Sequence, residues 1–520
     1  MNFGSHYFIK MGFFSILLTA VCILIAVLVA IQAFSIWSAW NRLQFYKNQG
    51  IKTYFYPLKG YYQMFSQKPK PGQSKVDDFF SNFVKGEYDR GVVACNTISD
   101  ARSVVHLLTS DHIKDFLLKE DLFERKFMIL DFPMDFGFLF QSGADVMHKR
   151  SIFQKIFLYE QLKNFTPLIC KLTQEYFEFV AKSNGVNKDT FTKIDLKEIF
   201  SVIIKKVSLV ILFGKYDFVE DSIEYQLQRN VDVQFEHAIA LITNPLIALA
   251  PKLCYTFPFL VKRLNMLKDK ITEQKALIAK YMKSREGQLP TGGSTMDRIV
   301  SLNTECVRSG NMADFMDTDE IIGTLNLIAF ASQDTSQNLT MNNICMMANN
   351  PEVRKVLEFC AEEIYDEAGF TTVEKIEEHQ NLSLFFKEAC RMNNAAFGLF
   401  NRIATTDVQI KDITIRKGDS VGCVFASLNY NSDIFKNPSE FQMDRFTKDK
   451  EKTYPRYQSI PFGVGKRVCV GRHLGELTVK LLTTAFCKYF EFRKPADVDY
   501  YVDFKLVRVS TQPFVDVKLK

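Results

Sequence analysis

Cys469 lies near the C-terminus in a glycine-rich segment, FGVGKRVCVG at residues 462–471, just before an apolar helical pattern at 474–490. The two glycines of FGVG can take a positive φ, which lets the backbone approach a flat ligand closely. Backbone N–H groups and a helix N-terminus lower the pKa of a thiol, and Arg467 adds positive charge nearby. The resulting thiolate is a nucleophile or a metal ligand, and no second cysteine accompanies it at zinc spacing. The alternative is a buried cysteine in a glycine-rich turn.

Asp334 and Thr335 form a second group with possible chemistry, in the window ASQDTS. They belong to a long helical pattern at 318–350, for which Asp317 and Glu320 predict a capping box. An acid and a hydroxyl in an apolar stretch are costly to bury without a partner. They therefore indicate a functional pair. Alternatively, or at the same time, the Thr335 hydroxyl bonds a carbonyl one turn back and kinks the helix.

Glu388 and Arg391 stand three residues apart in a helical pattern at 382–393. Residues at this spacing share one face of a helix and can form an ion pair. Most such pairs lie on solvated faces and contribute little to stability. The pair by itself therefore indicates no function.

The cysteine segment matches the pattern F-x-x-G-x-R-x-C-x-G at its five fixed positions, which are Phe462, Gly465, Arg467, Cys469 and Gly471. It therefore resembles the haem-binding loop of the cytochrome P-450 family. The resemblance implies that Cys469 is the axial thiolate ligand of haem b (iron protoporphyrin IX). It also implies that Arg467 meets a haem propionate and that Phe462 packs over the sulfur. The resemblance extends over about residues 50–520 and is strongest after residue 318.

Other segments resemble this family in the same order along the chain. The stretch FKEACR is similar to its E-x-x-R helix, which makes Glu388, Arg391 and the later Arg445 a structural triad that holds the cysteine loop. Arg150 and Arg402 match positions whose arginines contact the haem propionates. These assignments are what the resemblance implies.

The window around Thr335 resembles the oxygen-activating motif of the central family helix. By that match Asp334 and Thr335 relay protons during oxygen activation. The chain departs from the family at Ser332, where a glycine is usual, and at Gly475 and Thr478 in the last helix. The latter two departures are expected to affect packing more than ligation.

The composition is that of a large globular protein, with 520 residues, 47% of them hydrophobic, and a net charge of +6. Lys and Arg are spread along the chain without a basic stripe, so no nucleic-acid partner is predicted. The 11 cysteines are irregularly spaced, and a chain of this size needs no disulfides for stability. A reducing compartment is therefore expected.

The N-terminal segment contains no charged residue at 11–41, and about 20 apolar residues suffice to cross a bilayer as a helix. Lys and Arg residues follow this run more than they precede it, which places the rest of the chain in the cytoplasm. We therefore expect a membrane anchor at 1–42, a linker at 43–75 and a haem-thiolate monooxygenase domain at 76–520. The expected location is the endoplasmic reticulum membrane, with a single pass. The alternative is a buried core helix.

Helical patterns dominate the chain, and short strand-like stretches lie between or after them. The helical patterns cover 146–183, 197–213, 260–285, 318–350, 352–367, 382–393 and 472–490, and the strand-like stretches cover 403–410, 413–415, 507–509 and 514–519. We therefore predict a mainly α fold with small β-sheets, the cytochrome P-450 fold, preceded by a single transmembrane helix.

The resemblance implies a monooxygenase that inserts one oxygen atom from O2 into a small lipophilic substrate. No flavin or dinucleotide fingerprint is present, so the electrons are expected from NADPH-cytochrome P-450 reductase, with cytochrome b5 as a further candidate partner. Membrane lipid is also an expected partner. Basic residues that would face an acidic redox partner are Lys149, Lys155, Lys466 and Arg472. The alternatives are a sterol side-chain desaturase, an oxygen-independent haem-thiolate isomerase, against which Thr335 argues, and a non-catalytic haem carrier or sensor.

Overall fold

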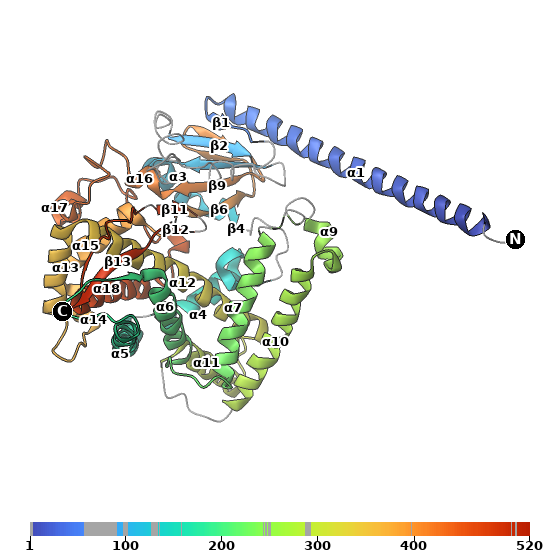
Figure 1. Ribbon diagram of the computed structural model, residues 1–520. Helices are drawn as coiled ribbons and strands as arrows, with labels where there is room; N and C mark the ends of the chain where they lie inside the picture. Colours follow the sequence, from blue (N-terminus) through green and yellow to red (C-terminus); the bar gives the residue numbers. More distant parts are fainter. Residues whose placement is uncertain are drawn as a thin grey trace.

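The computed structural model describes residues 4–56, 91–96, 102–125, 134, 136–157, 159–242, 244, 247, 251–285, 293–396, 398–500, 502–504 and 507–520. Figure 1 shows a mainly helical body with a β-rich region at one side, and a long first helix, α1, that projects away from the body. The predicted mainly α fold with small sheets is confirmed.

The helices follow one another along most of the described chain. They are α1 (Gly4–Lys47), α3 (Ser110–Leu118), α4 (Ala144–Gln154), α5 (Tyr159–Ser183), α6 (Leu196–Phe213), α7 (Ile223–Ile242), α9 (Pro251–Thr256), α10 (Lys262–Ser284), α11 (Thr295–Ser309), α12 (Thr318–Asn349), α13 (Pro351–Ile364), α14 (Val373–Glu378), α15 (Gln380–Asn393), α16 (Phe425–Asn429), α17 (Lys448–Glu451) and α18 (Arg472–Tyr489). The pattern at 146–183 was predicted as one helix, but the 3-10 turn Lys155–Phe157 divides it.

The largest sheet has the strand order β1 (Lys52–Tyr54), β2 (Val92–Asn96), β3 (Ser103–Leu107), β9 (Ser420–Val424), β6 (Gly398–Ala404) and β4 (Phe123–Arg125). Smaller sheets pair β10 (Phe490–Arg493) with β13 (Phe514–Leu519) and β5 (Thr192–Asp195), β11 (Val502–Phe504) with β12 (Arg508–Ser510), and β7 (Val408–Ile410) with β8 (Ile413–Ile415). The predicted strand at 403–410 is therefore two strands in two sheets.

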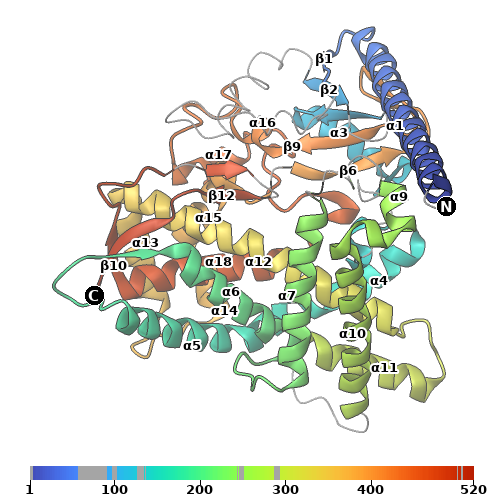
Figure 2. The ribbon, with the colours of Figure 1, turned by 45° about the vertical axis from the view of Figure 1, so that its right-hand side comes forward.

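The core lies around α12, which crosses the body between α6 and α18 (Figure 2). Its N-terminus has the predicted capping box, in which the Asp317 side chain accepts from the N–H of Glu320 and the Glu320 side chain accepts from the N–H of Asp317. Buried side chains from α5, α6, α13, α15 and α18 complete one apolar cluster with α12. The central helix is thus fixed on several sides, which gives its residues a defined position.

The C-terminal end of α1 is attached to the large sheet. Tyr46 is 0% exposed, and its hydroxyl donates to Asp419 Oδ2 at 2.7 Å. Arg42 Nε and the N–H of Ser103 donate to Asp419 Oδ1 at 2.7 and 2.8 Å. Strand β1 pairs with β2 directly afterwards. The chain from Arg42 to β1 therefore packs into the sheet, where a linker from residue 43 was expected, and the predicted boundary at 76 lies outside the described residues.

Within the described part of the chain, none of the helices combines the length and the hydropathy needed to cross a membrane.

Candidate active site

The cysteine loop has the backbone that its glycines predict. Gly463 and Gly465 have φ values of +72° and +77°, a region that favours glycine. A Cβ on Gly465 would also lie 2.5 Å from Glu120 Oε2. The loop closes through a hydrogen bond from the Cys469 N–H to the Phe462 carbonyl at 2.9 Å. Helix α18 follows with Gly471 as its N-cap, so Cys469 lies at a helix N-terminus as predicted.

The Cys469 thiol is accessible to solvent, yet protein surrounds it on most sides. Burial raises its pKa, while the N–H of Gly471 and the charges of Arg150 and Arg472 lower it. The predicted net lowering of the pKa is therefore not found, because desolvation outweighs the local donors. The positive charges that act on the thiol include those of Arg150 and Arg472.

Phe462 joins the cysteine loop to α15. Its ring stacks on Phe386 of α15 with centroids 6.2 Å apart and an interplanar angle of 16°. The Lys480 ammonium, which is 2% exposed, lies 5.5 Å from the Phe386 centroid. Because Phe462 O also accepts the Cys469 N–H, this aromatic stack fixes the backbone that carries the thiol.

Arg150 and Arg467 lie beside the cysteine. Arg150 of α4 is buried and donates from Nη2 to the carbonyl of Val468. Arg467 donates to the carbonyls of Phe138 and Gln141 at 3.2 and 2.9 Å. Arg150 therefore contacts the cysteine loop, and Arg467, which belongs to the loop, ties it to the segment before α4.

Arg402 of β6 and Arg125 of β4 stand opposite each other in the antiparallel pairing of these strands. The Arg402 side chain lies 3.3 Å from the Glu120 carboxylate. Arg125 was not singled out in the sequence, because a three-residue strand carries no local signal. Its pKa is lowered to about 9 by burial and by the charges of Arg402, Arg467 and Arg150. We call these four residues the arginine cluster: Arg125, Arg150, Arg402 and Arg467. Their positive charges repel one another.

The arginine cluster fits an anionic ligand. Arg402 Nε, Arg402 Nη2 and Arg125 Nε are buried and have no hydrogen-bond partner among the described residues. Burial lowers the pKa of all four arginines, and the charge of the Glu120 carboxylate offsets only part of that effect. Buried charges normally require pairing. Two carboxylates on a flat ligand next to Cys469, such as the propionates of a haem, would supply the missing acceptors.

The predicted triad residues contact one another. Arg391 makes a two-pronged ion pair with Glu388 at 2.7 and 2.8 Å and donates to the carbonyls of Asn429, Pro438 and Glu440. Arg445 Nε donates to Glu388 Oε1 at 3.2 Å. Glu388 and Arg391 are both 0% exposed. The pair therefore lies in the core and not on a solvated face, and it joins α15 to the segment that precedes the cysteine loop.

Thr335 lies near the middle of α12, which is an uninterrupted helix. Its hydroxyl donates to the Ala331 carbonyl one turn back at 2.7 Å, as the structural alternative predicted. Ser332, three residues before Thr335, shares a hydrogen bond with Ser208 of α6 at 2.9 Å. Asp334 is exposed. An accessible acid therefore stands next to a half-buried hydroxyl, in a stretch of α12 that is less buried than the residues before and after it.

An aromatic group borders this part of α12. Phe330 stacks on Phe235 of α7 with centroids 5.7 Å apart and an angle of 15°, and contacts Phe136 edge-on at 5.1 Å. Phe136 continues to Phe140 at 5.7 Å, and Phe140 to Phe400 at 5.5 Å. Phe400 in turn faces Arg125. The aromatic residues therefore form a continuous apolar path from α12 to the arginine cluster.

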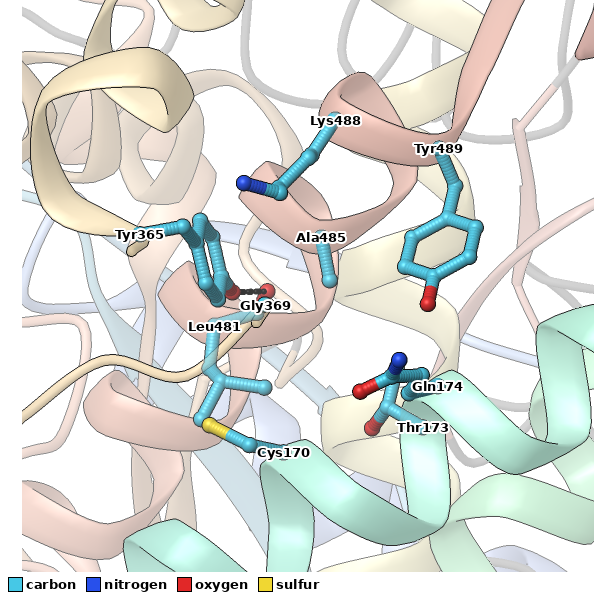
Figure 3. Close-up of a pocket in the computed structure, with 9 residues that line it drawn as sticks. All are labelled: Cys170, Thr173, Gln174, Tyr365, Gly369, Leu481, Ala485, Lys488 and Tyr489. Carbon is cyan, nitrogen blue, oxygen red and sulfur yellow. Dashed lines mark hydrogen bonds between the residues drawn. The ribbon is translucent and has the colours of Figure 1, made fainter. Parts of the chain in front are cut away.

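A separate cavity lies between α5 and α18, away from Cys469 (Figure 3). Its lining includes Cys170, Thr173 and Tyr365, whose hydroxyl donates to the Leu481 carbonyl at 2.9 Å. The volume is about 10 Å³, which holds a single water. This cavity therefore does not extend the candidate site.

Comparisons with known proteins agree with this geometry. The family model described as Cytochrome P450 matches residues 94–513. Cytochrome P450 6B7 of Helicoverpa armigera is 24% identical over 456 residues, which cover 84% of this chain and 86% of that protein. The cytochrome P450 CYP13A5 of Caenorhabditis elegans is 28% identical over 205 residues, 39% of this chain but only 38% of that protein.

A solved structure, the haem domain of cytochrome P450DA, has the same fold. It superposes with a TM-score of 0.73 and 15% identity, covering 90% of this chain and 97% of that one. At this identity the likeness concerns the fold alone. The family match, however, covers most of the chain and includes the cysteine loop, so the chain belongs to the cytochrome P450 family.

Proposed function

We propose that the protein is a haem-dependent monooxygenase that inserts one oxygen atom from O2 into a lipophilic organic substrate, with electrons from a separate reductase. One observation carries the proposal. A loop cysteine at a helix N-terminus lies beside the arginine cluster, in which three buried nitrogens of Arg125 and Arg402 have no hydrogen-bond partner in the part of the chain that the structure describes. This combination suits a flat metal ligand with two carboxylates.

The ligand proposed for this site is haem b. Cys469 would bind its iron, and Arg125, Arg150, Arg402 and Arg467 would receive its carboxylates. When bound, haem b supplies the iron at which O2 is reduced, and a thiolate ligand favours cleavage of the O–O bond. Gly471 would let the loop backbone approach the ring, since a Cβ at this position meets nothing within 4 Å in the protein.

Proton supply is the proposed role of Asp334 and Thr335. The Thr335 hydroxyl donates to Ala331 O and keeps its lone pairs available to accept from a water. Asp334 is exposed and can exchange protons with solvent. Bulk water would be excluded from the space beside α12 by the rings of Phe136, Phe235 and Phe330. Protons would then reach this space through the Thr335 hydroxyl and not directly from solvent.

The proposed electron donor is NADPH-cytochrome P-450 reductase, with cytochrome b5 as a second candidate. Two of the four basic residues expected at that interface have acidic neighbours within the chain. Lys466 pairs with Asp121 at 2.7 Å, and Lys149 pairs with Glu320. Arg472 and Lys155 therefore contribute most of the uncompensated positive charge that an acidic partner would meet.

The proposed location is the endoplasmic reticulum membrane, with the N-terminal segment as a single anchor and the catalytic domain in the cytoplasm. Support comes from the uncharged run at 11–41 and from apolar side chains on α1, such as Val29, Phe34 and Trp37, that are more than half exposed. Alkaline extraction of microsomes should leave the full chain in the membrane. Release into the supernatant, or protection of the domain from added protease, would contradict this arrangement.

The function is tested by the spectrum of the reduced carbon monoxide complex. The wild-type protein should show the long-wavelength Soret band of thiolate-ligated haem, and Cys469→His should move it to the position of a His-ligated haem. Cys306→Ala removes another thiol, which is buried in α11, and should leave the band unchanged. An unchanged band in Cys469→His would refute the ligand assignment. Turnover without O2 or reductase would favour an isomerase.

A further inference from the structure

A chain of buried side-chain amides joins α7, α10 and α12. Gln234 Nε2 donates to Asn230 Oδ1 at 2.6 Å and to Gln274 Oε1 at 2.7 Å, and Gln274 Nε2 donates to Asn326 Oδ1 at 3.1 Å. Gln234, Gln274 and Asn326 are 0% exposed, and Asn230 is 3% exposed. Helices α7 and α10 run side by side in both ribbon views (Figures 1 and 2). The amides are therefore held rigidly between packed helices.

Three buried atoms in this region have no hydrogen-bond partner within the residues that the structure describes. They are Asn230 Nδ2, Gln234 Oε1 and His237 Nδ1. His237 follows Gln234 by three residues, so the three side chains share one side of α7. Native proteins pair nearly all of their buried polar groups. The unpaired atoms therefore indicate that a small polar group is bound here.

The chemistry of the unpaired atoms selects that group. Asn230 Nδ2 can only donate, and Gln234 Oε1 can only accept. Turning over all four amides exchanges these roles but again leaves one donor and one acceptor. A hydroxyl satisfies both at once, a ketone satisfies only the donor, and a hydrocarbon satisfies neither.

The amide chain lies next to the candidate active site. Phe235, which follows Gln234, stacks on Phe330. Phe330 precedes Ala331, whose carbonyl accepts from Thr335. Asn326 and Thr335 are nine residues apart on α12, which corresponds to about 14 Å along a helix. A ligand held by the amides could therefore extend along the aromatic side chains toward Thr335.

We propose that Asn230, Gln234 and His237 bind the hydroxyl group of the substrate, which is then a long lipophilic alcohol. The inference rests on the proposed function for the reaction itself and adds the substrate class. Asn230 and Gln234 act as specificity-determining residues.

The test is calorimetric titration of the haem-loaded full chain in detergent. The probes are cholestanol with cholestanone and cholestane, and phytol with phytane. At least one alcohol should bind about tenfold more tightly than its hydrocarbon, the difference expected for a net gain of hydrogen bonding. Cholestanone should fall between the other two sterol probes.

Asn230→Leu and Gln234→Met should each remove the preference for the alcohol and leave the hydrocarbon affinity unchanged. Gln226→Met is the matched control, because Gln226 is on the same helix and donates to Asp221 O outside the amide chain. Circular dichroism and the melting temperature verify that each variant is folded, and His237→Phe replaces any variant that is not.

Two results would overturn the proposal. One is a wild-type protein that binds neither alcohol better than its hydrocarbon, which means that water alone occupies the site. The other is a preference that survives both substitutions. The carbon monoxide spectrum is read separately, so a missing thiolate band would refute the proposed function while calorimetry still reports on the amide chain.

Discussion

Two groups of buried arginines in this protein differ in how completely their charges are paired. In the triad, the Arg391 guanidinium makes five hydrogen bonds, two of them to Glu388. In the arginine cluster, three buried nitrogens of Arg125 and Arg402 have no partner among the described residues. The first group is fully paired within the described chain, whereas the second leaves buried donors to which an added anion could bind.

Both groups contain buried arginines, so residue type does not distinguish a structural site from a ligand-binding site. The completeness of charge pairing does. A buried charge that is fully paired is costly only when one partner is removed. A buried charge that lacks a partner is costly in the unliganded protein and becomes favourable when a ligand supplies the acceptor. The two groups should therefore respond in opposite ways to substitution.

The largest effect is expected in the triad. Glu388→Gln should lower the free energy of unfolding by about 3–5 kcal/mol, because it leaves two buried guanidinium groups without their carboxylate. Urea denaturation with and without haem should show the loss in both states. Lys387→Gln, which removes an exposed ion pair with Glu451 at 2.7 Å, should change stability by less than about 1 kcal/mol. A Glu388→Gln variant that is as stable as wild type would contradict the structural role of the triad.

In the haem-free protein, substitution in the arginine cluster should have the opposite effect on the free energy of unfolding. Arg402→Met removes a buried, incompletely paired charge, so the haem-free protein should be as stable as wild type or more stable. Haem affinity should fall roughly ten- to a hundredfold, the equivalent of one charged hydrogen bond. Transfer of haem to excess apomyoglobin measures this loss.

The control for Arg402 is Arg416→Met, because Arg416 lies over the Phe45 ring and outside the arginine cluster. It should leave haem retention unchanged. If Arg402→Met destabilised the haem-free protein as strongly as Glu388→Gln, the distinction between the two groups would be wrong.

A smaller effect is expected from Glu120, which is 8% exposed and partly offsets the charge of the arginine cluster. Glu120→Gln should destabilise the haem-free protein by about 1–2 kcal/mol, since the repulsion between the arginines increases. The loss should be smaller with haem bound, because the propionates supply negative charge. Thermal unfolding of both forms gives the comparison, and an equal loss in both would argue against ligand compensation.

The smallest effect on stability is expected from Thr335→Ala, since this hydroxyl makes only a local bond within α12. Folding and haem retention should match wild type. Product formed per NADPH should fall several-fold, and a tenfold loss corresponds to about 1.4 kcal/mol. Simultaneous measurement of product, NADPH and hydrogen peroxide tests this, and unchanged coupling would remove Thr335 from the proton path.

Local sequence patterns predicted those features of the site that are set by the conformation of neighbouring residues along the chain. The glycines around Arg467 predicted the positive φ values, and Asp317 with Glu320 predicted the start of α12. The i, i+3 spacing of Glu388 and Arg391 predicted their contact. It could not predict that both are fully buried, because solvated helices carry the same spacing.

Features that depend on distant segments were not predictable. Arg125 joins the arginine cluster only because β4 pairs with β6 across the fold. The amides of Asn230, Gln234 and Gln274 look like residues of solvated helix faces until α7 and α10 pack together. The raised pKa of the Cys469 thiol reflects how much protein surrounds it, which no local motif encodes.

The attachment of Tyr46 and Arg42 to Asp419 has a practical consequence for producing this enzyme in a shortened form. Removing the N-terminal segment is a usual route to a protein that crystallises. A chain cut after residue 46 would leave the Asp419 carboxylate, which is 0% exposed, with the Ser103 N–H but without its phenol and guanidinium partners. Truncation should therefore stop before Arg42, so that the last turns of α1 remain as part of the folded domain.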